Sequence, residues 1–309
     1  MISRSTWLHL RIPFSLYLMP VFCFAAATGN ETDWWRFCLV FIIIHLFLYP
    51  ASNGFNSYFD KDEGSIGGLE NPPPVKKELY NVSLGFDAIA LLLGLIISLE
   101  FTILLFIYGL VSKAYSHPYI RLKKNALAAW LAAGIFQGAF TYIMVRNGLN
   151  DVSINEIFNE EILFPALLAT FMIFGFYPMT QIYQHEEDSK RGDLTISYKL
   201  GIKGTFYFSA FWFALAAAGF AFYFNWYVVP LDLLTIPKNN IGCTRTYYVT
   251  FFVPFMIFML PLFIYFIRWF LRVRKDENAA DFHSTMMLNR IASVSLILFF
   301  ALLAIYRFW

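Results

Sequence analysis

The chain has 309 residues, of which 59% are apolar, 20% aromatic and only 14% charged. Soluble domains average about 45–50% apolar and about 25% charged residues, so this composition excludes a water-soluble globular protein. The net charge of +2 is too small to indicate a nucleic-acid partner. An apolar share of this size matches nine membrane spans of about 20 residues each. The composition therefore predicts a multi-span protein in a lipid bilayer.

Apolar runs divide the chain into nine predicted transmembrane helices. They cover residues 12–28, 35–55, 82–98, 100–112, 126–145, 161–183, 205–229, 248–271 and 289–308. The third and fourth runs together are too long for one helix, so we expect a turn near Glu100. Arg11 lies directly against the first run, and we expect this helix to be retained rather than cleaved as a signal peptide. Asn289 and Arg290 are expected to cap and anchor the last helix.

Basic residues are distributed unequally between the two sides of this arrangement. Eighteen of the 23 Lys and Arg residues share a side with the N-terminus, and five lie opposite: Arg36, Arg146, Lys238, Arg245 and Arg307. Lys and Arg collect on the cytoplasmic side of membrane proteins, so we expect the N-terminus and the loops after the even-numbered helices in the cytoplasm. In a bacterium the membrane would be the inner membrane. A wrong number of spans would mix the basic residues of the two sides. Their unequal distribution therefore supports a count of nine spans.

Acidic and amide residues gather after the second helix. Asn53, Asn56 and Asp60 are spaced by three and four residues, which predicts that they share one face of a helix. Asp62 and Glu63 follow directly, and Glu63 could supply the next carboxylate on that face. This loop therefore offers several hard oxygen ligands at one helix end.

The loop after the sixth helix repeats the pattern. Gln181, Gln184 and Asp188 have the same spacing, Glu187 borders their face, and Glu186 points away from it. The two acidic helix ends lie four spans apart on one side of the membrane. This predicts a single domain over residues 1–309 that contains two four-helix units and a ninth helix.

Basic residues accompany both acidic loops. Arg121, Lys123 and Lys124 follow the fourth helix, and Lys190 and Arg191 follow the acids after the sixth. Facing carboxylates suit Mg²⁺, which shares its coordination sphere with phosphate oxygens, while Lys and Arg would neutralise a diphosphate. If the apolar tail of such a substrate is allylic, loss of the diphosphate leaves a carbocation that aromatic faces stabilise. The three loops thus indicate a site for Mg²⁺ and a lipophilic diphosphate.

At these loops the sequence resembles the UbiA superfamily of intramembrane prenyltransferases, which has nine transmembrane helices and two aspartate-rich motifs. Asn56 and Asp60 match the first two positions of the first motif, and Asp188 matches the end of the second. Residues 192–201 match the tail of the second motif. Tyr115 opens a third matching segment, which ends in the basic residues after the fourth helix. The resemblance spans nearly the whole chain.

The chain departs from the family pattern at two acidic positions. The third acid of the first motif falls on Gly64, and the first Asp of the second motif falls on Gln184. A carboxamide offers a metal its carbonyl oxygen but no negative charge. The electrostatic attraction for Mg²⁺ is therefore weaker unless Glu63 or Glu187 supplies the missing negative charge. The number of bound metal ions stays open.

The resemblance implies an all-α integral membrane protein with nine transmembrane helices around a central cavity, which Gln137 is expected to face. It implies Mg²⁺-dependent transfer of an isoprenyl group from an isoprenyl diphosphate to an aromatic or other lipophilic acceptor. The expected metal ligands are Asn56, Asp60, Asp62, Glu63, Glu187 and Asp188, of which Asn56, Asp60 and Asp188 are the catalytic set. The expected substrate-binding residues are Asn53, Tyr115, Arg121, Lys123, Lys124, Gln184, Lys190 and Arg191.

Three other functions stay open at this point. A terpene cyclase of the same fold would use the same metal site but no acceptor. A membrane transporter would also place polar residues between helices, although transport sites normally lie near the bilayer midplane. The missing charge at Gln184 is compatible with a non-catalytic, lipid-binding relative. Each acidic cluster taken singly is typical of a solvated helix end, so the catalytic interpretation depends on finding the three loops on one side.

Overall fold

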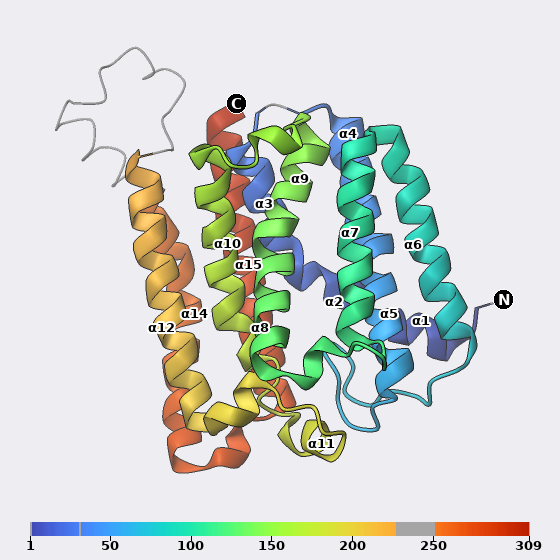
Figure 1. Cartoon of the computed structure of the whole chain (residues 1–309). Coiled ribbons are helices and arrows are strands. Elements are labelled where there is room, and N and C mark those ends of the chain that lie inside the picture. Colours follow the sequence, from blue (N-terminus) through green and yellow to red (C-terminus); the bar gives the residue numbers. More distant parts are fainter. Residues whose placement is uncertain (1, 31, 227–250, 309) are drawn as a thin grey trace.

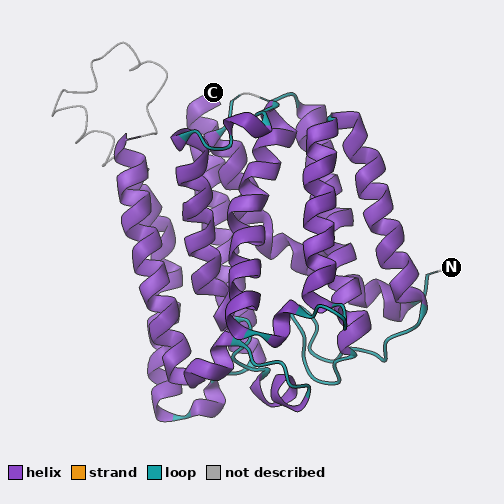
Figure 2. Cartoon of the chain, in the orientation of Figure 1, coloured by secondary structure: helices purple, strands orange, loops and turns teal. Residues whose placement is uncertain are grey.

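The computed structural model describes residues 2–30, 32–226 and 251–308, which form helices joined by short loops (Figures 1 and 2). The described ranges contain no β-strand, only two isolated β-bridges. Within them, nine helical segments are long and apolar enough to cross a membrane. These run over Arg4–Thr28, Trp34–Asp60, Glu78–Ile97, Leu99–Ser116, Ala126–Asn150, Glu160–Met179, Ile196–Phe224, Val253–Lys275 and Phe282–Tyr306. The predicted all-α membrane fold is confirmed.

The outer surface of the bundle carries the apolar side chains that a lipid environment requires. Leu92 is 66% exposed, Ile257 58% and Leu298 53%. Exposed apolar surface on this scale is unfavourable in water and normal against acyl chains. The interior is rich in aromatic pairs, such as Phe24 stacked on Phe300 with 4.7 Å between ring centroids.

The first span is broken at its beginning. It consists of α1 (Arg4–Leu10), α2 (Ile12–Ser15), the 3₁₀ turn η1 (Leu16–Leu18) and α3 (Met19–Thr28). Arg11 separates α1 from α2 with a φ of 47°, a left-handed conformation that ends one helix and redirects the chain into the next. The predicted first helix, 12–28, therefore extends further toward the N-terminus, as α1.

The second and fifth spans each contain a π-helical turn. Their pieces are α4 (Trp34–Ile42), η2 (Ile43–Leu48) and α5 (Tyr49–Asp60), then α8 (Ala126–Gly134), η4 (Ile135–Phe140) and α9 (Thr141–Asn150). The two spans touch just after these turns, where Tyr49 Oη lies 3.3 Å from Thr141 Oγ1. π turns bend a helix and release a backbone group, and they occur often at functional sites. Here the released N–H of Ala139 donates to Thr170 Oγ1 over 3.0 Å.

The third and fourth spans are two helices, as the sequence predicted. α6 (Glu78–Ile97) and α7 (Leu99–Ser116) are separated by Ser98, which is fully extended and caps α7 by accepting from the N–H of Phe101 over 3.0 Å. The turn lies two residues before Glu100. Both helices are longer than the predicted runs.

The remaining helices correct two expectations. α10 (Glu160–Met179) ends before Gln181, so Gln181 and Gln184 lie in a turn that leads to α11 (His185–Lys190), and the predicted common helix face with Asp188 does not exist. α15 (Phe282–Phe308) begins seven residues before Asn289, so Asn289 is inside the helix and is not its cap.

The seventh and eighth spans are α12 (Ile196–Trp226), bent at Gly201, and α14 (Val253–Lys275). Three further short 3₁₀ turns lie within the described residues: η3 (Leu122–Lys124), η5 (Ile154–Glu156) and η8 (Glu277–Ala279). The predicted end of the seventh helix and start of the eighth, with Lys238 and Arg245, lie outside the described residues. The internal duplication into two four-helix units stays a prediction.

The loops with polar residues meet at one end of the bundle, at the bottom of Figure 1. We call this end the polar-loop face; it consists of residues 61–77, 117–125, 180–195 and 276–281. The two loops that carry the acidic clusters are thereby brought together, although four spans separate them in sequence.

Candidate active site

A cavity of about 320 Å³ lies inside the bundle and reaches the polar-loop face. Its wall is contributed by α2, η1, α3, α5, α7, α8, η4, α10, α11, α15 and the adjoining loops. Nine of the residues selected from the sequence line it: Asn53, Asn56, Asp60, Asp62, Tyr115, Lys123, Gln184, Asp188 and Arg191. Gln137 lines it as well, as expected.

The first acidic loop presents its residues from the end of α5. Asn53, Asn56 and Asp60 share the helix face that their spacing predicted, and all three line the cavity. Asn56 is oriented by Ser116, whose Oγ donates to Asn56 Oδ1 over 2.5 Å. α5 ends at Asp60, and the next residue, Lys61, takes a left-handed φ of 51° and turns the chain so that the following loop folds back beside the cavity.

The second acidic loop reaches the cavity by a different route. Asp188 lies on the short helix α11 and is 7% exposed. Gly192, with a φ of 73°, ends this segment in a conformation that favours glycine. Gln184 ties the two loops together by donating from Nε2 to the carbonyl of Ser65 over 3.0 Å.

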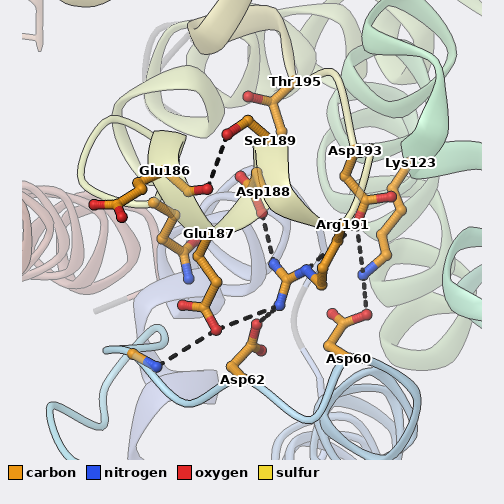
Figure 3. Close-up of polar contacts among 12 residues, drawn as sticks. Asp60, Asp62, Lys123, Glu186, Glu187, Asp188, Ser189, Arg191, Asp193 and Thr195 are labelled. Atoms are coloured by element: carbon orange, nitrogen blue, oxygen red, sulfur yellow. Dashed lines mark hydrogen bonds and ion pairs between the residues drawn. The ribbon is translucent and has the colours of Figure 1, made fainter.

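The side chain of Arg191 joins acids from both loops (Figure 3). Its guanidinium forms an ion pair with Asp62 from the first loop and donates from Nη2 to Asp188 Oδ1 over 2.7 Å. Glu187 and Asp193 lie further off, each with an oxygen 3.7 Å from a guanidinium nitrogen. The two acidic clusters therefore converge on one cation.

Lys123 connects the basic loop to the same network. Its ammonium group pairs with Asp60 and lies 3.7 Å from Asp193 Oδ2. Asp193 in turn accepts two hydrogen bonds from Arg121, through Nε and Nη2, each 2.9 Å long. All three loops that the sequence singled out thus contact one another through charged side chains.

The pKa values of Asp188 and Asp193 are shifted in opposite directions. Burial raises the pKa of Asp188 to about 7; Lys123 opposes the shift, while Asp193, Asp60 and Glu187 add to it. Burial also acts to raise the pKa of Asp193, but the hydrogen bond from Arg121 and the charges of Lys123, Arg121 and Arg191 outweigh it and lower this pKa below its usual value. Asp193 is thus ionised at neutral pH, whereas Asp188 is poised to gain or lose a proton.

Five of the residues selected from the sequence do not line the inner cavity. Lys124 is exposed, and Arg121 lies behind Asp193. Glu63, Glu187 and Lys190 line an outer hollow on the polar-loop face instead, which shares Asp60, Tyr183, Gln184 and Arg191 with the inner cavity.

The carboxylate of Glu187 occupies the space that a side chain at position 64 would take. The carboxylate of Glu187 accepts from the N–H of Glu63 over 2.9 Å and from that of Gly64 over 3.4 Å. A Cβ at position 64 would lie 2.6 Å from Glu187 Oε2. An acid at this position, as in the resembling family's motif, would have to displace Glu187.

Four cavity residues were missed as site residues. Asp193 is 1% exposed and holds its basic partners across loops, which no local pattern reveals. Arg11 donates to the carbonyls of Gly67 over 3.4 Å and Asn53 over 3.3 Å. Tyr177 hydrogen-bonds Tyr115 through the two hydroxyls. Asn289 was placed at a helix start because the apolar pattern begins there. In the sequence, Arg11 is marked only by its position beside the first apolar run. Asp193 is marked only by its position after Gly192.

The comparisons with known proteins agree with this architecture. The sequence model of the UbiA prenyltransferase family matches residues 17–237. No curated protein matches the chain. Among solved structures, a digeranylgeranylglyceryl phosphate synthase is similar over 98% of both chains, with 19% identity and a TM-score of 0.59. A UbiA homolog from Archaeoglobus fulgidus bound to GPP and Mg²⁺ covers 97% of this chain and 99% of its own, with 14% identity and a TM-score of 0.63.

The same homolog bound to DMAPP and Mg²⁺ gives 13% identity and a TM-score of 0.64, again over 97% and 99% of the two chains. The TM-scores over nearly the full length of the chains establish a common fold. The family match covers more than half of the sequence, and the chain therefore belongs to the UbiA prenyltransferase family.

Proposed function

We propose that the protein uses Mg²⁺ to transfer an isoprenyl group from an isoprenyl diphosphate to a lipophilic acceptor inside the membrane. The observation that carries this proposal is the contact of one guanidinium, that of Arg191, with Asp62 from the first acidic loop and Asp188 from the second. The family membership and the GPP, DMAPP and Mg²⁺ in the similar structures support it.

The charges of the network fit a divalent cation. Five carboxylates, those of Asp60, Asp62, Glu187, Asp188 and Asp193, face three cations, those of Arg121, Lys123 and Arg191. In the described part of the chain, no three His, Cys, Asp or Glu side chains form a preassembled metal site, because the acids are paired with Lys and Arg. We infer that the cation arrives with the diphosphate, whose oxygens complete its coordination.

Different residues would hold the cation and the diphosphate. The cation would be held by Asn56, Asp60, Asp62 and Asp188, with Glu63 and Glu187 available from the outer hollow. Mg²⁺ would offset the negative charge that develops on the departing diphosphate. Lys123 and Arg191 lie in the cavity wall beside these acids and would bind the diphosphate oxygens directly.

The deeper part of the cavity suits the isoprenyl tail. Its wall includes Tyr49, Tyr108 and Phe136, which lie well inside their spans. Aromatic faces stabilise an allylic cation, and an apolar wall keeps water from reacting with it. The allylic cation then reacts with the electron-rich acceptor instead of with water.

The test uses purified protein in proteoliposomes with Mg²⁺, prenyl diphosphates of graded length and a membrane extract as the acceptor pool. Mass spectrometry should detect a prenylated conjugate, and released diphosphate should depend on Mg²⁺. A cyclised hydrocarbon with no conjugate would indicate a terpene cyclase instead. Flux of an unchanged substrate would indicate a transporter, and tight binding without turnover would indicate a non-catalytic relative.

Three matched variants sharpen this test. Asp60→Asn and Asp188→Asn should each reduce diphosphate release at least about a hundredfold, the scale on which electrostatic stabilisation of a leaving group acts. Glu161→Gln is the control, because Glu161 is exposed in the first turn of α10 and lines neither the cavity nor the outer hollow. If the two aspartate variants release diphosphate as fast as the control, the proposed function is wrong.

We also infer that the polar-loop face is cytoplasmic, from the excess of Lys and Arg on that side. A cysteine at exposed Lys76 in a background free of native cysteines should react with an impermeant reagent only from the cytoplasmic side. Reaction from the opposite side would reverse the orientation.

A further inference from the structure

The cavity ends near the middle of the bundle. Six spans contribute to its wall, and in each of them the lining residues stop at or near the middle of the span. The deepest lining residues are Val21, Tyr49, Tyr108, Gln137, Met172 and Leu296. Residues 22–28, 34–48, 99–107, 138–150, 160–171 and 297–306, all of which the structure describes, do not line it. The cavity is therefore a pocket that is closed at its inner end.

The other half of the bundle is filled by aromatic side chains. Phe24 is fully buried, and its ring centroid lies 4.7–5.3 Å from those of three other fully buried rings, which belong to Tyr142, Phe220 and Phe300. Protein interiors packed in this way have few voids larger than a water molecule. In the described part of the bundle, an isoprenyl tail therefore has no room to continue beyond the inner end of the cavity.

Three aromatic rings from three spans form this inner end. Tyr49 begins α5, the helix that ends at Asp60, and is 2% exposed. Its ring centroid lies 5.7 Å from that of Tyr108, which lies 6.5 Å from that of Phe136. We call these three residues, Tyr49, Tyr108 and Phe136, the aromatic floor. It faces the acids of the first loop from the opposite end of α5.

A hydrogen bond fixes the ring of Tyr49 in the aromatic floor. Thr141 Oγ1 donates to the carbonyl of Phe136 over 2.8 Å, so the hydroxyl of Tyr49 is the donor in its 3.3 Å contact with the same oxygen. The bond joins α5 to the span that contains η4. A buried hydroxyl that loses its partner pays the cost of its desolvation, so the ring of Tyr49 resists displacement by a longer tail.

The length of α5 sets the depth that is available to a substrate. Eleven helical steps separate Asp60 from Tyr49, which is about 16 Å at 1.5 Å per residue. The ion, with its bonds of about 2 Å to oxygen, and the two phosphate groups occupy roughly the first 5 Å, which leaves about 11 Å. Three main-chain bonds of an extended polypeptide span about 3.3–3.6 Å, so the four chain bonds of an isoprene unit span about 4.5 Å. Two isoprene units fit into the remaining depth, and a third does not.

The volume of the cavity agrees with a short tail. It is about 320 Å³, at the lower end of the range of about 300–1,000 Å³ for pockets that hold drug-sized molecules. This space has to accommodate the diphosphate, the tail and the reacting part of the acceptor. On the side of the ninth span, the Oγ of Ser293 donates to the carbonyl of Tyr17 over 3.3 Å and joins α15 to the first span beside the cavity.

We propose that the donor is a ten-carbon isoprenyl diphosphate and that the aromatic floor, through Tyr49 above all, sets this length. The inference rests on the proposed function and goes beyond it by naming the donor. One methylene group more than an apolar pocket can hold changes kcat/KM by about 10–200-fold, so each isoprene unit beyond the second should cost at least about tenfold. A five-carbon donor would leave half of the depth unfilled and bury less apolar surface.

The test compares donors of five, ten, fifteen and twenty carbons at equal mole fraction in wild-type proteoliposomes, with Mg²⁺ and the membrane extract as the acceptor pool. Diphosphate release gives kcat/KM for each donor, and mass spectrometry identifies the conjugates. We expect the highest kcat/KM at ten carbons and a value at least about tenfold lower at fifteen. Equal values for ten, fifteen and twenty carbons would overturn the inference.

Two variants enlarge the inner end of the cavity from different helices. Tyr49→Ala on α5 and Leu296→Ala on α15 should each raise the ratio of kcat/KM for fifteen carbons to that for ten at least about tenfold. Leu296→Ala decides the question if Tyr49→Ala does not fold. Tyr49→Phe keeps the ring and should retain the wild-type ratio. Tyr207→Ala is the matched control, because Tyr207 is 63% exposed on α12 and lies outside the cavity.

The ratio between donors is compared across variants because longer donors partition more strongly into lipid, which affects every variant alike. Ratios equal to the control in both enlarged variants would overturn the inference, since the tail would then leave the cavity sideways between α15 and the first span. Failure of the proposed function has a different result: the wild type would release no diphosphate from a donor of any length. Release without a preference for length overturns the inference alone.

Discussion

Asp193 holds the guanidinium of Arg121 with two hydrogen bonds, from Nε and Nη2, each 2.9 Å long. Asp193 lines the cavity, whereas Arg121 does not. The same carboxylate lies 3.7 Å from the ammonium of Lys123. Arg121 is therefore placed to orient Asp193, and through it Lys123, instead of contacting a diphosphate itself. The two loops also meet beside this pair, in a β-bridge between Asn125 and Leu194.

This relationship predicts that Arg121 and Asp193 act as one unit. Arg121→Gln and Asp193→Asn should each raise the KM for GPP about tenfold, because each removes the same charged pair. The double variant should be no worse than the worse single variant, since contacting residues are not additive. Lys203→Gln, which removes a half-exposed ion pair with Glu277, is the control. Independent, multiplying effects would show that Arg121 acts on the substrate separately.

The raised pKa of Asp188 predicts a pH-dependent affinity for Mg²⁺. Below its pKa of about 7 the carboxyl of Asp188 is protonated, and the proton must leave before the group can bind a cation. The apparent affinity should therefore fall as the pH is lowered from about 8 to about 6, by up to about tenfold per unit. Calorimetry in buffers of different ionisation enthalpy should detect the released proton. Asp188→Asn should bind Mg²⁺ weakly at all these pH values; an unchanged pH dependence in that variant would assign it to another group.

The amide of Gln184 should stabilise the folded protein more than a carboxylate at the same position would. Its Nε2 donates to the carbonyl of Ser65, which a carboxylate cannot do, and the cavity already holds more carboxylates than cations. Gln184→Asp should therefore lower the melting temperature in the absence of Mg²⁺, and saturating Mg²⁺ should restore most of the loss. Gln184→Leu also loses the hydrogen bond but adds no charge, so Mg²⁺ should not restore it. Equal recovery of both variants would contradict the charge argument.

The contact between η4 and α10 should be intolerant of one methyl group. A Cβ on Gly138 would lie 2.5 Å from the Cα of Thr170, and this atom cannot move without displacing α10. Gly138→Ala should lower the free energy of unfolding by about 1–3 kcal/mol, measured in detergent by chemical or thermal unfolding. Gly85→Ala on α6 is the matched control: it meets no atom within 4 Å and should be neutral or stabilising by up to about 1 kcal/mol. Similar losses in both variants would contradict the packing argument.

The sequence predicted the site best where a regular helix carries it. Asn53, Asn56 and Asp60 line the cavity together because α5 continues without a break to Asp60. For the second loop the prediction named residues that line the cavity, but it placed them on a helix face that does not exist. The apolar side chains of Ile182 and Tyr183 extend the apparent span, although α10 ends at Met179 and the chain then turns.

Other features depended on contacts that one sequence does not encode locally. Asn289 was taken as a helix cap because the start of α15 mixes polar residues with apolar ones, and a run of apolar residues becomes visible only later. Asp193 becomes a site residue through Arg121, which belongs to another loop. Such pairings follow from how the helices pack, and local spacing holds no information about them.

The central claim is that the acids of the two loops share one divalent cation with the diphosphate. Binding of Mn²⁺ can be counted by electron paramagnetic resonance in the presence of an unreactive thio analogue of GPP, for the wild type, Asp60→Asn, Asp188→Asn and the double variant. Because both aspartates hold the same ion, we expect each single variant to lose it and the double variant to lose no more. Retention of a separate ion in each single variant, with additive loss in the double variant, would contradict a shared site.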